Sequence, residues 1–169
     1  MNYFQLFSLP VQFSIDKNIL AHHYRELQKQ FHPDNFVMLS DGERLIAMQK
    51  STEINDAYQT LKNNCLRAQY LLLLAGLDIE LEQRTLQDKQ FLMQQMLWRE
   101  QIESFSVDDE DEIELFSRNI QEQVNNLESK IEKQLQEEAL EATADSIRKL
   151  KFMLKLQTEI DQLEEKLFD

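Results

Sequence analysis

The side chains of this sequence that could do chemistry gather near its beginning. They are the histidines His22, His23 and His32 and the aspartate Asp34, which Pro33 joins to His32. Imidazole and carboxylate groups bind metal ions, exchange protons or recognise charged partners. Adjacent histidines on a helix point in different directions, and no histidine pair here has the i, i+4 spacing of helical zinc ligands. The spacing therefore argues against a metal site.

Acid–base catalysis by His32 with Asp34 is a second reading of the same residues. It is disfavoured because the sequence offers no Ser or Cys nucleophile and no Gly-rich loop that would complete a catalytic site with them. The third reading is recognition, in which a proline-fixed loop presents an imidazole and a carboxylate to a partner. A simple turn competes with it, since x-Pro-Asp is also ordinary turn chemistry. The predicted structure on either side of the tripeptide is needed to choose between a recognition loop and a simple turn.

Two amphipathic helices are predicted to hold this tripeptide between them. The first covers residues 14–31, where Ser14 could act as the N-cap and Asp16 would lie in the first turn. Pro33 ends this helix because its ring displaces the preceding residue from the α region. Apolar residues recur along one face at i, i+4, i+7 and i+11: Leu20, Tyr24, Leu27 and Phe31.

The other face of this helix is basic, with His22, Arg25 and Lys29 at helical spacing. Such a stripe favours an acidic or polar partner surface. A second helix is predicted to begin near Asp41 and to pair antiparallel with the first across a loop of about ten residues. Its stripe consists of Ala47, Ser51, Ile54, Tyr58 and Leu61. The tripeptide thus lies in the connection of a helical hairpin.

The composition favours a soluble all-α protein. The chain has 169 residues with only two glycines and two prolines, whereas helix formers abound. The one cysteine excludes an internal disulfide and a cysteine-cluster metal site, and it fits a reducing compartment. The beginning of the chain does not read as a secretory signal, and the longest apolar run, 70–76, is too short to cross a bilayer. We therefore expect a cytoplasmic protein, without metal or cofactor, that does not enter a membrane.

The charge is distributed unevenly along the chain. Residues 1–75 hold seven Lys or Arg and seven Asp or Glu, whereas residues 76–169 hold eleven against twenty-four, a net charge of −13. A nucleic-acid partner would require a basic surface, so none is expected. The asymmetry indicates two functional regions joined near Gly76. We predict a first domain over 1–75, a linker over 76–83 and a second domain over 84–169.

The first domain should also contain two shorter helical segments. Residues 3–9 are expected to form an apolar helix that plugs the hairpin, and residues 65–75 a further helix. The second domain is predicted to hold three helices, about 84–105, 110–138 and 140–168, with the bundle spacing of alternating steps of three and four. The acidic run 108–114 lies where a helix should begin, which suits the helix dipole better than a metal role.

The stretch 91–105 is apolar on two sides. Its expected core stripe is Phe91, Trp98, Ile102 and Phe105. The outer side carries Leu92, Met93 and Met96, which point roughly 100–200° away from that stripe at about 100° per residue. Charged residues share this outer face: Arg99, Glu100 and Glu103. The residues alone leave two readings open, a wider buried face or a docking surface built partly of adaptable methionine.

At this point the sequence resembles a known family. An apolar N-terminal helix, a basic helix, His-Pro-Asp and a second long helix together resemble a J-domain. The stretches "NYFQLFSLP", "LQKQFHPDNF" and "INDAYQTLKNNCLRAQYLL" resemble the HscB co-chaperones of iron–sulfur cluster assembly. The stretch "ADSIRKLKFMLKLQTEIDQLEEKL" is similar to the C-terminal bundle of that family. The resemblance spans nearly the whole chain and implies an all-α fold, a J-domain followed by a three-helix bundle.

The resemblance also implies a function. J-domains stimulate ATP hydrolysis by a DnaK-type chaperone, and in this family the partner chaperone is HscA and the client is the cluster scaffold protein IscU. The chaperone-binding residues implied here are His32, Pro33 and Asp34, helped by Arg25, Lys29 and His22. The scaffold-binding residues implied here are Leu92, Met93, Met96, Phe152, Arg99, Glu100 and Glu103. The protein would then not be an enzyme but the activator of one.

Three features depart from the family pattern. Asn35 stands where many J-domains carry lysine, so the basic surface ends one charge early. Met96 stands where leucine is expected, a change that the flexible thioether should tolerate. The zinc-binding cysteine pair of some eukaryotic relatives is missing, which favours a bacterial-type protein without metal.

Other classes of function remain open on the sequence. One is a helical adaptor in which His-Pro-Asp is merely a turn, so that Asp34→Asn would leave a chaperone ATPase unaffected. Another is a J-domain co-chaperone with a different client. The last is a small metal-dependent hydrolase, which would require about one zinc or iron per chain.

Overall fold

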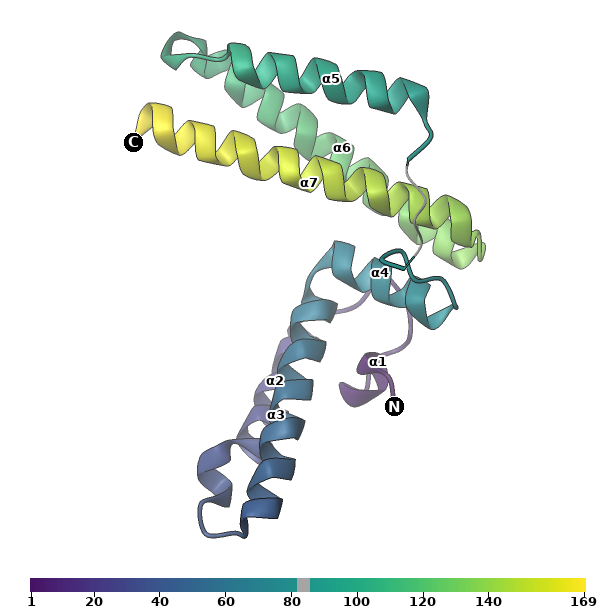
Figure 1. Cartoon of the computed structure of the whole chain (residues 1–169), viewed down its shortest axis with the longest axis vertical. Helices are drawn as coiled ribbons and strands as arrows, with labels where there is room; N and C mark the ends of the chain where they lie inside the picture. The colour runs from purple at the N-terminus through teal and green to yellow at the C-terminus, as the bar shows by residue number, and fades with distance from the viewer. Residues whose placement is uncertain (82–85) are drawn as a thin grey trace. The chain divides into compact units, whose positions relative to one another are not determined.

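A computed structural model of the chain describes residues 1–81 and 86–169. These residues form helices joined by short connections and contain no strand, which confirms the predicted all-α class. The chain divides into two compact units, residues 1–74 and 75–169 (Figure 1). The predicted linker 76–83 and the predicted bundle start at residue 84 fall partly on residues 82–85, outside the described residues. The functional division into J-domain, linker and client-binding bundle stays a prediction.

The first unit is built on a helical hairpin. Helices α2 and α3 lie side by side and run in opposite directions, with the His-Pro-Asp loop at the end away from α4 (Figure 1). A 3₁₀ turn, η1, occupies part of the loop that the sequence left without structure. The elements are α1 Tyr3–Leu6, α2 Lys17–Phe31, η1 Pro33–Phe36, α3 Asp41–Lys62 and α4 Asn64–Leu74. The predicted hairpin is therefore confirmed.

The capping residues correct one boundary and confirm another. Helix α2 begins at Lys17 rather than at residue 14, because Asp16 and not Ser14 is its N-cap. The Asp16 carboxylate accepts hydrogen bonds from the backbone N–H groups of the second and third helical residues, at 2.9 and 3.2 Å. Helix α3 begins at Asp41 as predicted, with the Ser40 hydroxyl accepting from a backbone N–H at 3.2 Å.

The core of the first unit joins both ends of its sequence. The short helix α1 packs its buried Phe4 into the unit, and Tyr3 stacks on Tyr70 of α4 with ring centroids 4.5 Å apart. Between the long helices, Tyr24 stacks on Tyr58 at 3.8 Å. The buried apolar side chains of the unit are Phe4, Phe7, Leu9, Phe13, Leu20, Ala47, Ile54, Ala57, Leu61, Cys65, Ala68, Leu71 and Leu72. The predicted plug role of residues 3–9 agrees with this burial.

One charged side chain is buried in this unit. Arg67 is only 3% exposed, and its guanidinium lies over the ring of Phe13, 4.8 Å from the centroid. Its Nε donates to the carbonyl of Phe13 at 2.6 Å, and its Nη1 donates to the carbonyl of Leu61 at 2.7 Å. The second of these carbonyls belongs to the last turn of α3, where no intrahelical donor remains. Arg67 thus fastens the segment before α2 to the end of α3.

The second unit is a bundle with an unequal core. Its elements are α5 Lys89–Ser104, η2 Val107–Asp109, α6 Glu110–Gln136 and α7 Leu140–Phe168. The three long helices lie side by side (Figure 1). The buried core belongs to the last two of them: Ile113, Phe116, Ile120, Val124, Leu127 and Ile131 of α6, and Ala144, Ile147, Leu150, Met153, Leu156 and Ile160 of α7. The acidic run begins α6, as its dipole favours.

Helix α5 differs from the expectation in two ways. It begins at Lys89, because Asp88 is its N-cap and accepts from the backbone N–H of Phe91 at 3.1 Å. None of its residues is fully buried, so the predicted core stripe is only half-buried. Aromatic rings of α5 pack against α7. The ring centroids of Phe91 and Trp98 lie 5.8 and 6.1 Å from the ring centroid of Phe152 on α7. Within the described part of the chain, no helix is long and apolar enough to cross a membrane.

Candidate functional site

The His-Pro-Asp loop has a defined local geometry. His32 leaves the helical region, with φ −62° and ψ 133°, as the following proline requires. Its Nδ1 accepts a hydrogen bond from the backbone N–H of Asp34 at 3.2 Å, which caps the turn η1 that Pro33 opens. An Nδ1 that accepts leaves Nε2–H as the donor of a neutral imidazole. Both the imidazole and the Asp34 carboxylate are largely exposed, with Nδ1 and Oδ2 3.5 Å apart.

Asn35 ties the loop to the preceding helix. Its side-chain amide donates to the carbonyl of Lys29 in the last turn of α2. This carbonyl lacks an intrahelical donor, so the bond satisfies an otherwise orphaned group. The residue that departs from the family pattern therefore has a structural role, which the sequence did not reveal.

The predicted basic residues converge beside the loop. Arg25, Lys29 and His32 line one open concavity of about 510 Å³, together with Gln28 and Asn35. His22 lies one turn earlier on the same exposed helix face and does not line this concavity. Pro33 and Asp34 follow directly in the chain. The structure thus brings three predicted chaperone-binding residues into one surface and leaves His22 at its border.

The other histidine has a structural partner. His23 Nδ1 lies 2.5 Å from the carbonyl oxygen of Phe7, so this ring nitrogen is used inside the first unit. His22 and His23 have ring centroids 5.9 Å apart. Over residues 1–81 and 86–169, no three His, Cys, Asp or Glu side chains gather closely enough to hold a metal ion.

The outer face of α5 is exposed rather than part of a wide buried face. Met93 is 66% exposed and Met96 65%, while Leu92 is 39% exposed. The reading in which these side chains belong to the core is therefore wrong. Leu97, at 55% exposure, extends this apolar face and was missed, although the same helical wheel places it next to Met93.

The predicted scaffold-binding residues from two helices meet at one concavity. Its volume is about 340 Å³. Five of the seven predicted residues line it, four from α5 and one from α7: Met96, Arg99, Glu100, Glu103 and Phe152. Gln95 completes the lining and was not foreseen. Leu92 and Met93 are exposed on the same helix and continue the surface. We call the surface formed by Leu92, Met93, Met96 and Phe152 the α5 patch.

Arg99 holds this surface in place. Its guanidinium forms an ion pair and hydrogen bond with Glu159 of α7 and lies 5.4 Å from the ring centroid of Phe152. The hydrogen bond from Arg99 lowers the pKa of Glu159, with partial burial opposing it, and the same bond raises the pKa of Arg99. The sequence placed Arg99 at a partner interface, whereas the structure shows that it also joins α5 to α7.

A second ion pair fixes the beginning of α5. Lys149 Nζ lies 2.8 Å from a carboxylate oxygen of Asp88 and 5.5 Å from the ring centroid of Phe91. The hydrogen bond from Lys149 is the main reason why the pKa of Asp88 is lowered. Helix α5 is thus held on α7 by rings and two ion pairs.

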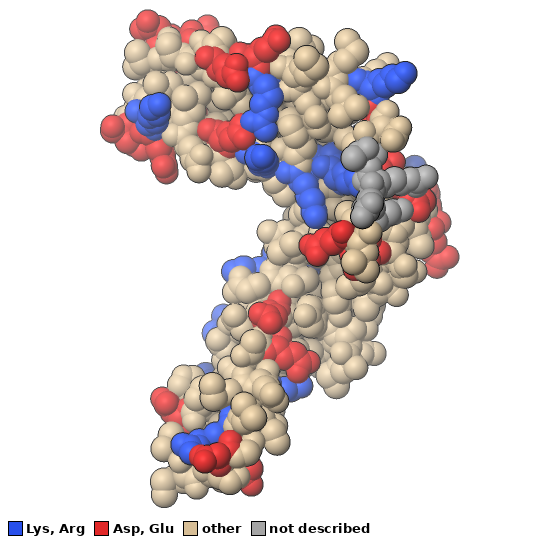
Figure 2. Space-filling model, viewed as in Figure 1, with Lys and Arg blue, Asp and Glu red and all other residues tan. Residues whose placement is uncertain are grey.

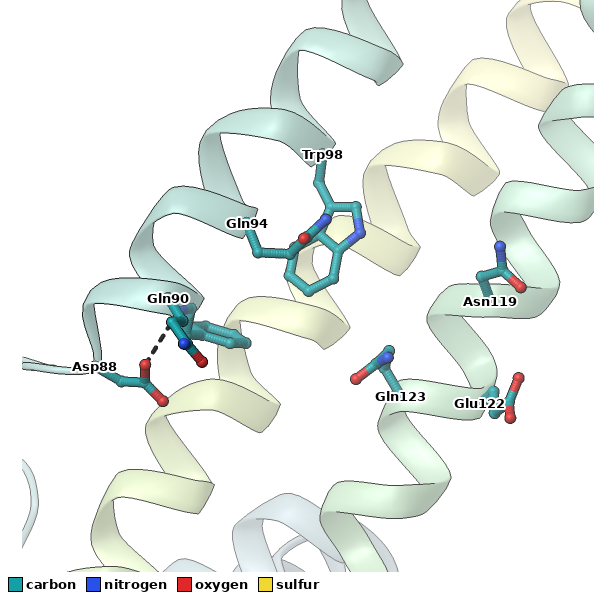
Figure 3. A pocket seen from close by; sticks show the side chains of 8 residues that line it. Asp88, Gln90, Gln94, Trp98, Asn119, Glu122 and Gln123 are labelled. Carbon is teal, nitrogen blue, oxygen red and sulfur yellow. Dashed lines mark hydrogen bonds between the residues drawn. The ribbon is translucent and has the colours of Figure 1, made fainter.

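The opposite flank of α5 has a different character. An open cleft of about 530 Å³ separates α5 from α6, and amide side chains of both helices project into it beside Trp98 (Figure 3). Its lining is Asp88, Gln90, Phe91, Gln94, Trp98, Asn119, Glu122 and Gln123. Acidic side chains are spread over the unit that holds α5, α6 and α7 (Figure 2). The concavity that combines apolar side chains with both signs of charge is therefore the one that α5 forms with Phe152 of α7.

The comparisons with known proteins relate the whole chain to one family. Residues 87–161 match the model of the HSCB C-terminal oligomerisation domain. The chain is 70% identical over 169 residues, all of both chains, to a co-chaperone protein HscB homolog of Psychromonas ingrahamii. It is 48% identical to a homolog of the same name from Vibrio vulnificus, over 99% of each chain.

Solved structures show the same likeness. The chaperone HscB from Vibrio cholerae superposes with a TM-score of 0.90 at 43% identity, covering 99% of this chain and all of that one. The human co-chaperone protein HscB superposes with a TM-score of 0.92 at 25% identity, covering 99% of this chain and 84% of that one. From the full-length identity and the shared fold, we conclude that this chain belongs to the HscB co-chaperone family.

Proposed function

We propose that this protein stimulates ATP hydrolysis by the DnaK-type chaperone HscA and delivers to it the iron–sulfur cluster scaffold protein IscU. The chain would take no part in the chemistry of ATP hydrolysis itself. Family membership supports a co-chaperone role in cluster assembly. The two exposed surfaces, one in each unit, supply a place for each partner. The encounter would take place in the cytoplasm.

The first surface suits an acidic partner. Arg25 and Lys29 bring two fixed positive charges to the concavity that His32 borders. Charges at the rim of an interface accelerate association and fix its register more than they raise affinity. The His-Pro-Asp loop is held by Asn35 and by its own capping bond, so its backbone and the His32 imidazole are presented with little conformational freedom left to lose.

The second surface suits a partner with an apolar centre and polar edges. The α5 patch offers two exposed methionines whose flexible thioethers adapt to an irregular surface. Glu100 and Glu103 lie at its edge beside Arg99, as in the polar rim of a protein interface. Arg99 and Phe152 contribute to the contacts that join α5 to α7 and so bring these residues into one surface.

Both surfaces on one chain explain how stimulation and delivery would be coupled. A client bound to the α5 patch is present wherever the first unit meets the chaperone, which raises its effective concentration there. Contact with the loop would favour the chaperone conformation that hydrolyses ATP, provided that the loop binds that conformation more tightly.

The observation that best supports the proposal is the concavity shared by Arg25, Lys29 and His32 beside the exposed carboxylate of Asp34. A plain turn would not require basic residues about one and two helical turns before His32 to line the same concavity. The test measures single-turnover ATP hydrolysis by purified HscA with this protein, with Asp34→Asn and with Asp161→Asn. Asp161 is an exposed aspartate of α7, so Asp161→Asn changes the same charge elsewhere.

We expect the wild-type protein to stimulate ATP hydrolysis. Asp34→Asn should not stimulate it, because this variant keeps the size of the side chain but loses its charge. Asp161→Asn should stimulate like the wild type. No stimulation by the wild type would reject the proposal. Equal stimulation by Asp34→Asn would contradict the role given to the loop carboxylate, whereas a wild-type protein that does not stimulate would favour the helical adaptor.

A further inference from the structure

The first unit exposes a group of apolar side chains that neither its core nor the basic surface uses. Met38 is 96% exposed, Ile46 66% and Val37 60%, and Leu39 and Leu45 are exposed as well. These five residues, which we call the apolar tip, follow η1 and begin α3. Scattered exposed apolar residues are normal, but five large ones within ten positions are not, and such patches mark interaction sites.

The apolar tip has a small concavity of its own. About 220 Å³ is enclosed by Phe31 at the end of α2, Phe36 of η1, and Leu39, Glu43, Ile46 and Ala47 around the start of α3. This volume is smaller than the roughly 300–1,000 Å³ of small-molecule pockets. Its lining is almost wholly apolar. The concavity therefore fits an aliphatic side chain of a protein better than a small polar ligand.

This concavity and the basic one lie on either side of the same short loop. Phe31 lines the apolar concavity, and the next residue, His32, lines the basic one. Asn35 and Phe36 repeat this arrangement within η1. A partner that covers the His-Pro-Asp loop therefore reaches both concavities at once. At this end of the unit, charged side chains of both signs lie among uncharged surface (Figure 2).

We propose that the apolar tip is a second docking point for the same chaperone, and that it receives a Leu, Ile, Val or Met side chain next to the chaperone's acidic contact. This inference rests on the proposed function. Continuity with the His-Pro-Asp surface identifies the occupant. A second copy of this chain is the competing occupant, and the oligomeric state distinguishes the two.

Two contacts of different chemistry respond differently to salt. Binding through Arg25 and Lys29 weakens as salt screens their charges, whereas burial of an aliphatic side chain does not. The wild-type protein should thus keep part of its affinity for the chaperone at high salt. A protein without the apolar tip should lose nearly all of it.

The experiment uses the full-length triple variant Val37→Thr, Met38→Gln and Ile46→Gln. Each substitution keeps the approximate size of an exposed side chain, and glutamine is a good helix former for α3. The control is Leu66→Gln, which changes an exposed apolar residue of α4 at the other end of the hairpin. The measured quantity is the concentration of each protein that gives half-maximal stimulation of HscA, at low and at high salt.

We expect that concentration to rise about tenfold to 100-fold in the triple variant, as burial of roughly one aliphatic side chain implies. Leu66→Gln should match the wild type, and circular dichroism should show equal helicity in all three proteins. An unchanged half-maximal concentration, with Asp34→Asn still inactive, would overturn this inference and leave the proposed function standing. A wild-type dimer in sedimentation that the triple variant abolishes would overturn it in favour of a second copy.

Discussion

Truncation of the α5 patch should weaken scaffold binding by an amount that the structure sets. The change is Leu92→Ala, Met93→Ala and Met96→Ala together in the full-length protein. Their exposed fractions, 39%, 66% and 65%, amount to about 1.7 fully exposed side chains. Full burial of one such side chain contributes roughly 2 kcal/mol. Because alanine keeps its β-carbon, the expected loss is about 2–3 kcal/mol, or about 30- to 150-fold in Kd.

The assay is calorimetric titration of purified IscU into each protein. Leu115→Ala, which removes a 53% exposed leucine from α6, is the matched control and should bind like the wild type. The triple variant should unfold in urea at nearly the same concentration as the wild type, since exposed helical residues are replaced by the best helix former. Equal affinity of the triple variant and the wild type would refute the reasoning, because the exposed apolar area would then lie outside the interface.

Two further predictions concern the contacts that hold the surfaces in place. Arg67→Met should lower the unfolding free energy of the first unit by about 3–5 kcal/mol in urea titrations, because the carbonyls of Phe13 and Leu61 lose a buried charged donor. Glu159→Gln should make the free energy of unfolding less sensitive to acid. Arg99 lowers the pKa of Glu159 in the folded protein, so the ionised Glu159 contributes fully to stability above the ordinary pKa of 4.5. This contribution is lost as the pH falls through the lowered pKa.

Controls separate these effects from general damage. Arg118→Met removes an exposed arginine of α6 and should change stability by less than about 0.5 kcal/mol. For the acid effect, the stability difference between wild type and Glu159→Gln should shrink in urea titrations carried from pH 7 to below pH 4.5. A difference that stays constant over this range would mean that the ion pair with Arg99 adds nothing to folding.

The sequence predicted well those features that follow from local patterns. The antiparallel hairpin, the start of α3 at Asp41 and the acidic start of α6 rest on apolar spacing and capping chemistry, which are properties of neighbouring residues. The outer side of α5 was also found by its wheel, because two apolar faces on one helix exceed what a surface helix needs. The choice between burial and exposure required the structure.

What the sequence missed depends on residues far apart in the chain. Ser14 and Asp16 are both good N-caps, and only the path of the chain before α2 selects the second. The burial of Arg67 depends on a carbonyl 54 positions away, which no local pattern reveals. Arg99 was given only a partner-binding role, because its ion pair with Glu159 spans 60 positions.

The apolar tip was overlooked for a different reason. Val37, Met38 and Leu39 stand together in the sequence, but a run of three apolar residues in a loop has no helical period from which to judge exposure. The predicted stripe of α3 includes the buried Ala47 and leaves out Ile46, but a single apolar residue outside a stripe does not by itself mark a patch. A composition count restricted to the loop and the first turns of α3 would have shown the excess of large apolar residues.

The central claim is that stimulation and delivery require both surfaces on one molecule. The most direct measurement is the rate of HscA ATP hydrolysis with IscU and an equimolar mixture of two variants, Asp34→Asn and the α5-patch triple alanine variant. We predict that the mixture stays well below the wild-type rate, because neither molecule brings the client and the loop to the chaperone together. A mixture that equals the wild type would contradict the account, since separate molecules would then supply the two functions.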